Sequence, residues 1–498
     1  MSDAADVCLI IEGGYPYVLG GVSSWTDALI RSLPQRRFQV VALSISAQQR
    51  VPKYAIPENV VGLTDVLLDH SRPGRWFIRS NDRAIEAITT RLRSVLTDDN
   101  GAEFVALIHA LESSGLGHRL LLDSRRAWKA LERTYKSLLP TAPLVDFFWT
   151  WRFLARSVLA IAAAPIPDAR VYHAVSTGYA GLLGARAKCV TRRPLIVTEH
   201  GIYTNERRIE ICAADWIYES TASGFDVFDR TPELRDLWQE AFTSFSRIAY
   251  NMADSITTQF RANQSFQMKD GAPLSKLVII CNGIDVAQFA RISPADEPRR
   301  PCILLIGRVV PIKDIRTFIL ATGILRQLVP DVEAIIIGPE DEDPGYAAEC
   351  RSLVQQQGLQ DVVRFLGRVK DIKDYFGRVD LIVLTSISEA QPFAILEAGA
   401  AGLPAVTTDV GSCREILEGD PDDVVRESGG IVVPSCDPQA TAAAIAKILL
   451  NPALRRRMGE VMRKRVQAHY DETRTSRIYD ELYASLSEIG TCETATRY

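Results

Sequence analysis

The sequence predicts an α/β protein with two doubly wound parallel sheets and a helical segment inserted in the first. Short apolar, β-branched runs alternate with helical stretches in both halves of the 498-residue chain, which is typical of parallel sheets covered by helices. A polar, proline-rich stretch at 291–301 separates the two series and has the composition of a linker. The length also exceeds what one hydrophobic core usually supports.

The first series opens with a strand, a glycine-containing loop and a helix. We expect this helix from about Ser23 to Leu33, with strands at 7–11, 39–44, 171–175, 194–198, 255–258 and 278–280. Gly20 and Gly21 in the loop would allow the backbone to approach a phosphate or a sugar closely. The loop is not G-x-G-x-x-G, so the dinucleotide fingerprint is absent.

A helical, aromatic-rich segment from about 58 to 165 interrupts this series. Its densest part is the run Phe147–Phe153. Core packing is the expected role of such a cluster, because burial of large rings dominates core energetics. A platform for an acceptor or a surface for a partner protein is the alternative.

The second series predicts strands at 302–306, 333–337, 362–366, 379–384 and 404–407 with helices between them. The end of the chain, from about 471 to 490, is expected to be helical.

Two glutamates stand at one strand-to-helix junction of the second series. Glu389 follows a buried strand, and Glu397 lies in a helix that begins after Pro392. Such junctions bind ligands, because the helix start offers unpaired N–H groups and the end of the strand opens into a crevice. Two carboxylates there suit a polyhydroxylated ligand. The alternative is a solvated loop acid and a first-turn acid that complements the helix dipole.

Two cations follow the first strand of the same series. Arg308 comes directly after Gly307, and Lys313 precedes the next helix. Arginine offers bidentate hydrogen bonds and lysine a point charge, so the pair suits a diphosphate. Without the two glutamates, Arg308 and Lys313 would be interpreted as part of an exposed charged loop. The presence of the glutamates favours a diphosphate-binding site.

The arrangement G-R-x4-K followed by E-x7-E resembles the retaining GT-B glycosyltransferases of family 4. The resemblance implies two Rossmann-like domains that face a cleft. We place the first, with the insertion, at 1–295 and the nucleotide-sugar domain at 296–470, and we expect the last helix, 471–498, to cross back to the first domain.

The same resemblance implies roles for single residues. Arg308 and Lys313 would hold the nucleotide diphosphate, Glu389 the donor sugar at the catalytic centre and Glu397 the ribose. The remaining expected contacts are backbone groups of Gln391, Pro392 and Phe393 to sugar or phosphate, groups around Arg368 and Val369 to the base, and Gly20 and Gly21 on the phosphate or acceptor side.

The segments 12–25 and 198–204 resemble one branch of this family, which serves Pel exopolysaccharide synthesis. This resemblance implies a UDP-sugar donor and transfer of a hexose or N-acetylhexosamine onto a growing polysaccharide. It also implies cooperation with inner-membrane Pel proteins. A UDP-sugar epimerase of the same fold and a non-catalytic sugar-binding subunit are the alternatives.

Two histidines are candidate catalytic residues. His200 lies at the end of a strand beside Gly201, and His173 lies at the end of another strand of the first series. Both positions favour a role toward the sugar or the acceptor, because histidine is the commonest acid–base group. A satisfied structural histidine is the alternative for each.

Composition excludes several other classes. The net charge of -4, from 57 basic and 61 acidic side chains, gives no basis for nucleic-acid binding. An acidic start without a long apolar run predicts a cytoplasmic protein, which would be recruited to the inner membrane face. The D-x-D sequences at 341–343 and 420–422 lie in acidic loops and are interpreted as solvated turns. We therefore predict no metal ligands and no obligatory cofactor, because Arg308 and Lys313 can neutralise the diphosphate.

Overall fold

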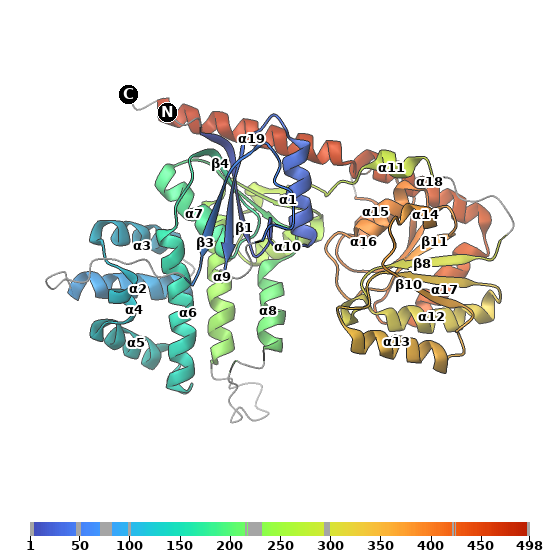
Figure 1. Cartoon of the computed structure of the whole chain (residues 1–498), viewed down its shortest axis with the longest axis horizontal. Coiled ribbons are helices and arrows are strands. Elements are labelled where there is room, and N and C mark those ends of the chain that lie inside the picture. Colours follow the sequence, from blue (N-terminus) through green and yellow to red (C-terminus); the bar gives the residue numbers. More distant parts are fainter. Residues whose placement is uncertain are drawn as a thin grey trace. The chain divides into compact units, whose positions relative to one another are not determined.

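The computed structural model describes residues 4–45, 51–69, 82–97, 101–214, 217, 232–292, 299–420, 423 and 425–495. Two compact units make up the chain (Figure 1). Unit 1 comprises residues 1–258, 263–279 and 479–498, and unit 2 comprises 259–262 and 280–478. The division lies before the expected boundary at 295, because Val286 and Phe289 pack in the core of unit 2. Most of the expected linker falls outside the described residues.

Unit 1 contains a seven-stranded sheet in the order β3-β2-β1-β4-β5-β6-β7. Its strands are β1 (Ala5–Glu12), β2 (Phe38–Ser44), β3 (Val60–Leu67), β4 (Ala169–Ala174), β5 (Leu195–Glu199), β6 (Ser255–Thr258) and β7 (Leu277–Ile279). Each pair of neighbours is parallel, and Leu9 of β1 lies opposite Val40 of β2 and His173 of β4. The strand order reverses between β1 and β4, where doubly wound sheets bind ligands.

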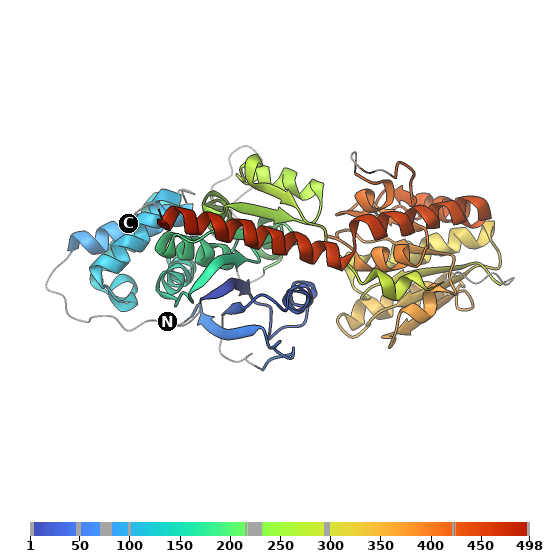
Figure 2. The same ribbon diagram turned by 90° about the horizontal axis from the view of Figure 1, so that it is seen from above.

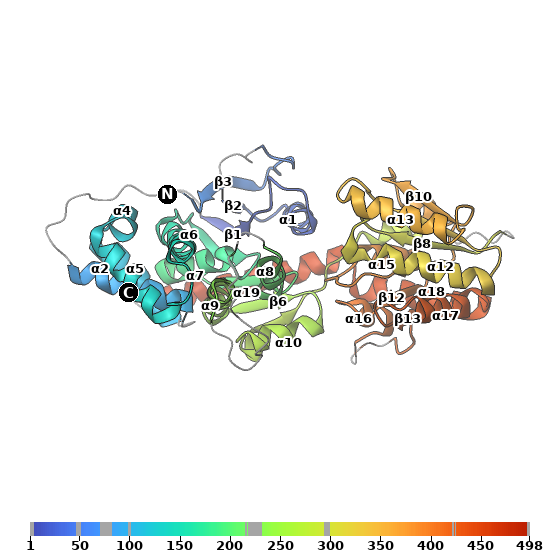
Figure 3. The ribbon, with the colours of Figure 1, turned by 90° about the horizontal axis from the view of Figure 1, so that it is seen from below.

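Helices cover the sheet of unit 1, and some of them extend beyond it. They are α1 (Gly21–Ser32), α2 (Asp82–Thr97), α3 (Gly101–Ser114), α4 (His118–Leu122), α5 (Arg125–Leu138), α6 (Leu144–Ala163), α7 (Tyr179–Thr191), α8 (Tyr203–Ala213), α9 (Leu234–Met252) and α10 (Arg261–Lys269). Figure 3, seen from below, looks nearly along α6, α8 and α9. The inserted helices begin at α2 and not near residue 58, because β3 belongs to the sheet.

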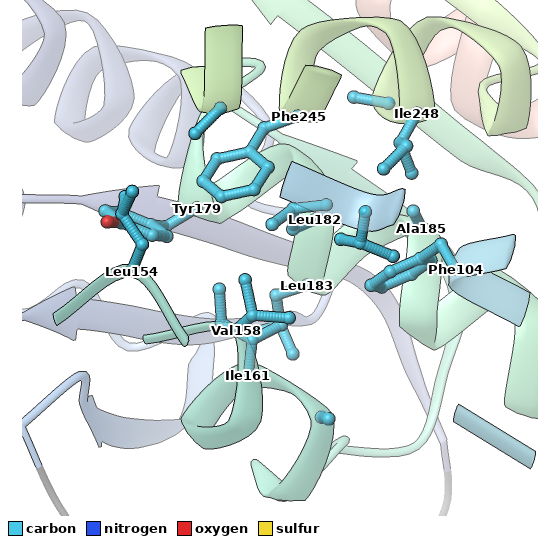
Figure 4. Close-up of a cluster of buried hydrophobic side chains, with 14 of the residues drawn as sticks. Phe104, Leu154, Val158, Ile161, Tyr179, Leu182, Leu183, Ala185, Phe245 and Ile248 are labelled. Atoms are coloured by element: carbon cyan, nitrogen blue, oxygen red, sulfur yellow. The ribbon is translucent and has the colours of Figure 1, made fainter. Parts of the chain in front are cut away.

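The core of unit 1 joins the inserted helices to the doubly wound part. In Figure 4, Leu154, Val158 and Ile161 of α6 lie near Leu182 and Leu183 of α7, with Phe245 and Ile248 of α9 on the other side. Helical periodicity divides the aromatic run of α6. Phe147 and Trp151 are buried, whereas Trp149 is 60% exposed and Phe153 is 38% exposed. Core packing therefore accounts for only part of this run.

Unit 2 contains a six-stranded sheet in the order β10-β9-β8-β11-β12-β13, again with parallel neighbours. Its strands are β8 (Cys302–Ile306), β9 (Glu333–Ile337), β10 (Val363–Gly367), β11 (Leu381–Leu384), β12 (Ala405–Thr408) and β13 (Gly430–Val433). Its helices are α11 (Val286–Ala290), α12 (Ile315–Leu328), α13 (Pro344–Gln356), α14 (Lys373–Phe376), α15 (Phe393–Ala400), α16 (Cys413–Glu418), α17 (Pro438–Leu449) and α18 (Pro452–His469). The order reverses between β8 and β11, so the predicted fold of two Rossmann-like parallel sheets is confirmed.

The last helix, α19 (Glu472–Ala495), contributes to both units. Its residues up to Ile478 belong to unit 2, and those from Tyr479 belong to unit 1. In unit 1 the Tyr479 and Tyr483 side chains are buried, and Arg36 forms an ion pair with Asp480 (2.6 Å). Figure 2 shows α19 in red along unit 1. None of the described helices is long and apolar enough to cross a membrane.

Candidate functional site

Three loops of unit 2 meet where its strand order reverses. They follow β8, β11 and β12 at the carboxyl edge of the sheet. Ile387 N donates a hydrogen bond to Ile312 O (2.9 Å), which links the β11 and β8 loops. Ser412 N donates to Ala390 O (2.8 Å), which links the β12 and β11 loops. The loops therefore hold their side chains in fixed positions relative to one another.

Glycines allow these loops and the loop after β9 to approach one another closely. At Gly338, after β9, φ is +156°, and an added Cβ would lie 1.9 Å from Gly307 O. At Gly411 φ is +52°, and an added Cβ would lie 2.1 Å from Ala390 O. A side chain at either position would force the loops apart.

Lys313 and Glu389, predicted separately, form an ion pair in this site. Lys313 Nζ donates to Glu389 Oε1, which also accepts a hydrogen bond from Ser386 Oγ (2.7 Å). The lysine and glutamate side chains are 19% and 12% exposed. Both charged ends are thus largely shielded from solvent and held at the reversal point of the sheet.

Arg308 points to a different partner. Its Nη1 atom lies 2.7 Å from Glu342 Oε2, and the two side chains are 53% and 40% exposed. Arg368, which follows β10, lies 3.1 Å from Asp341 Oδ1 in a still more exposed pair. Val369 is half-buried beside it. None of the hydrogen bonds and ion pairs of the described residues joins Arg368 or Val369 to the Lys313–Glu389 pair, and β10 is two strands from β8.

Glu397 lies in the second turn of α15. Burial raises the pKa of its carboxyl to about 7, because a low-dielectric environment disfavours the charged form. Within the described residues this carboxyl has no hydrogen bond or ion pair. It can therefore interact with a ligand hydroxyl without first breaking a bond to the protein.

The residues around the start of α15 contribute either structural contacts or free backbone groups. The Gln391 side chain is buried, and its Oε1 accepts a hydrogen bond from Asn282 N (2.8 Å). Pro392 is the N-cap residue of α15, and its carbonyl oxygen accepts a hydrogen bond from Ile395 N (3.1 Å). The N–H groups of Phe393 and Ala394 open the helix, and helix starts leave such groups without intrahelical acceptors. This turn can thus offer backbone N–H groups to a ligand, and their contact with sugar or phosphate stays a prediction.

The acids of the D-x-D sequences have structural partners. Asp341 pairs with Arg368, and Asp343 accepts a hydrogen bond from Tyr346 N (3.0 Å) as the cap of α13. Asp420 pairs with Arg261 (2.9 Å), and Asp422 lies outside the described residues. Across the described part of the chain, the acids, histidines and cysteines form no group of three that could hold a metal ion.

The contacts of His173 favour a structural role, and its catalytic role stays a prediction. Its side chain is fully buried in unit 1, with Nδ1 at 2.7 Å from Tyr483 Oη and Nε2 at 2.7 Å from Thr198 Oγ1. Burial lowers its pKa to about 3, so the ring is neutral at physiological pH. Both ring nitrogens already have protein partners, and the histidine links β4 to α19.

His200 is half-buried and contacts the edge of Trp25, with ring centroids 4.5 Å apart. Burial lowers its pKa to about 4, so this imidazole is also neutral near pH 7. Gly20 and Gly21 are exposed at the start of α1, where Gly20 is the N-cap residue. His200, Gly20 and Gly21 all belong to unit 1 and stay predictions for the acceptor side.

Glu12 is a further candidate residue that was not predicted from the sequence. It is the last residue of β1. Its carboxyl accepts hydrogen bonds from Tyr203 Oη (2.9 Å) and Tyr179 N (2.8 Å), and burial raises the pKa of this carboxyl. Its place after the first strand of a doubly wound sheet is the signal that could have revealed it.

Comparison with known proteins agrees with this division into two halves. Residues 5–275 match the family described as Domain of unknown function (DUF3492). The chain belongs to this family. Residues 288–465 match Glycosyl transferases group 1. The second half of this DUF3492 member is therefore a glycosyltransferase group 1 domain.

Curated relatives are glycosyltransferases. The D-inositol 3-phosphate glycosyltransferase of Kineococcus radiotolerans is 29% identical over 216 residues, which cover 40% of this chain and 49% of the relative. The lipopolysaccharide core biosynthesis mannosyltransferase LpcC of Rhizobium leguminosarum bv. viciae is 30% identical over 216 residues, covering 42% and 59%. The chain thus spans about half the length of these relatives.

Solved structures share the fold over nearly the whole chain. Anabaena Alr3699/HepE, in complex with UDP, has a TM-score of 0.58 at 15% identity and covers 96% of this chain and 99% of its own. Sucrose-phosphate synthase of Thermosynechococcus elongatus has a TM-score of 0.57 at 16% identity and covers 96% and 98%. At this identity the likeness concerns the fold.

Proposed function

We propose that the protein is a retaining glycosyltransferase that moves a hexose or N-acetylhexosamine from a UDP-sugar onto a growing polysaccharide. The observation that carries this proposal is the Lys313–Glu389 pair at the reversal point of the second sheet. A cation for a diphosphate and a carboxylate for sugar hydroxyls lie there side by side. Membership of group 1 by the second half and the curated glycosyltransferase relatives support the same reaction class.

In this proposal each side chain exchanges a protein partner for the donor. Lys313 moves from Glu389 to the diphosphate, and Glu389 then accepts hydrogen bonds from sugar hydroxyls. Arg308 leaves Glu342 and adds a second positive charge to the leaving diphosphate. Glu397 accepts hydrogen bonds from the ribose, and the N–H groups that open α15 meet sugar or phosphate oxygens. Arg368 and Val369 would reach the base only after Arg368 leaves Asp341.

Variants of the two cations test this proposal. Lys313→Ala and Arg308→Ala should each reduce UDP-sugar turnover by about 10²-fold or more, since each removes a charge that stabilises the leaving diphosphate. The readouts are UDP release and thermal unfolding of each variant with a panel of UDP-sugars. EDTA should leave wild-type turnover unchanged, because these cations replace a metal. Wild-type UDP release in both variants would refute the assignment.

Retention and net transfer have separate readouts. The anomeric configuration of the product, observed by NMR, tests retention. Sugar-nucleotide chromatography after incubation without an acceptor separates a transferase from an epimerase, which would convert the UDP-sugar by itself.

We further propose that the acceptor is a Pel-type exopolysaccharide, which would make this chain the glycosyltransferase PelF. The segments 12–25 and 198–204 support this narrower proposal. In it, the protein works at the inner face of the membrane through contacts with Pel synthase proteins. Membrane fractionation tests this, because removal of the other Pel proteins should release the chain from the membrane fraction. Retention in that fraction would contradict recruitment by partners.

A further inference from the structure

Unit 1 contains a cavity of about 880 Å³ at the carboxyl edge of its sheet. One side of it is formed by residues at the ends of three strands, namely Glu12 and Gly13 of β1, Ser44 and Ile45 of β2, and Asp69 just after β3. Parallel sheets bind ligands at this edge, and the volume is that of a typical ligand site. None of the predicted donor-site residues lines this cavity.

The inserted helix α6 supplies the opposite side. Trp149 and Phe153 from its first half line the cavity together with Trp238 and Phe242 of α9. The Phe153 and Trp238 ring centroids are 5.4 Å apart. Figures 1 and 3 show α6, α8 and α9 extending side by side beyond the sheet. An indole that is 60% exposed, as in Trp149, presents a flat apolar face to a ligand.

The three arginines of the wall all form ion pairs. Arg156 pairs with Asp69 (2.7 Å), and Arg207 pairs with Glu210 (2.8 Å). Arg152 pairs with Asp123 (2.6 Å), which lies just outside the lining. The lining contains more acids than arginines, since Glu12 and Asp146 add to Asp69 and Glu210, and this balance does not favour an anionic ligand. An alkyl chain would desolvate these ion pairs without giving them new partners, which costs free energy.

We propose that this cavity binds a neutral oligosaccharide, namely a segment of the acceptor chain. The apolar faces of the sugar rings pack on Trp149 and Phe153. The sugar hydroxyls exchange hydrogen bonds with the paired arginines and acids and with Glu12 at the end of β1. The identity of this oligosaccharide as acceptor rests on the proposed transferase function, whereas the binding itself does not.

Calorimetry on the full chain tests the proposal. The probes are neutral tetrasaccharides of glucose, N-acetylglucosamine and N-acetylgalactosamine, with decyl phosphate as a lipid-like comparison. At least one tetrasaccharide should bind, and Trp149→Ala and Phe153→Ala should each weaken that binding by about tenfold. Trp128→Ala is the matched control, because Trp128 is 46% exposed on α5 and does not line the cavity.

A donor-site variant separates this proposal from the proposed function. Lys313→Ala should keep tetrasaccharide affinity while it loses UDP-sugar turnover. Trp149→Ala should keep UDP-sugar affinity while the KM for the tetrasaccharide acceptor rises. The proposal is overturned if no tetrasaccharide binds, if decyl phosphate binds in their place, or if Trp149→Ala and Trp128→Ala have equal effects.

Discussion

Lys313 and Glu389 show what a sequence can predict at the scale of single residues. Each was predicted as a site residue from its place after a strand, and the structure puts both at the reversal point. Their mutual ion pair was not predicted, because it depends on the long-range contact between Ile387 and Ile312. The structural partner of His173 could not be predicted for the same reason, since Tyr483 lies on the last helix of the chain.

Glu397 should make donor binding depend on pH. Its pKa of about 7 means that the carboxyl is largely protonated at pH 6. Ribose hydroxyls donate best to the ionised form, so binding must release the proton. The affinity for a UDP-sugar should therefore fall below pH 7, by up to about tenfold per pH unit. Calorimetry at about pH 6 and about pH 8 measures this change.

Glu397→Gln is the control for this pH effect and should give an affinity that is independent of pH in this range. The stability of the wild type should change in the same window. The native state holds the proton more tightly than the unfolded chain, so the free energy of unfolding decreases as pH rises from 4.5 to about 7. A wild-type affinity that is equal at both pH values would contradict a ribose contact by Glu397.

At the scale of elements, most strands were predicted to within about two residues, and β3 and β13 were missed. β8 and β9 match their predicted ranges. β3 was overlooked because Gly62 and Asp65 interrupt its apolar pattern, and β13 because it is short and follows Gly429. Sheet neighbours stabilise both strands, and a local pattern does not contain that information.

Acids of the loop after β9 pair with arginines, two of which the proposed function assigns to the donor. Glu340, Asp341 and Glu342 pair with Arg351, Arg368 and Arg308, respectively. Exposed pairs of this kind contribute about 0.2–1 kcal/mol. Glu342→Gln should thus free Arg308 and strengthen UDP-sugar binding by about two- to fivefold, with a smaller gain at high salt.

The matched control for this loop is Glu349→Gln. Glu349 forms a similarly exposed pair with Arg316 on α12 and should leave the affinity unchanged. Calorimetric titration of both variants at low and high salt distinguishes the outcomes. Weaker UDP-sugar binding by Glu342→Gln would mean that Glu342 contacts the donor itself.

At the scale of the whole molecule, the last described helix, α19, begins in unit 2 and ends in unit 1. Both polar and apolar contacts attach this helix to unit 1. Tyr483 Oη bonds to His173, and Arg36 bonds to Asp480. Sequence analysis could predict the helix from its composition but not these contacts, because their partners are hundreds of residues away in the chain.

Tyr483→Phe should therefore destabilise unit 1 without altering the donor site. The variant leaves His173 Nδ1 buried without its partner, which costs about 1–3 kcal/mol. Because the pKa of His173 is about 3, the ring stays neutral near pH 7, and the loss of stability should not vary with pH in this range.

Ser485→Ala is the matched control, since Ser485 is exposed on the same helix and bonds only to Leu482 O among the described residues. Thermal unfolding should show a lower midpoint for Tyr483→Phe alone, while its UDP-sugar affinity equals that of the wild type. An unchanged midpoint would show that the apolar contacts of α19 suffice to hold it on unit 1, and a lost affinity would show that this helix acts on the donor site as well.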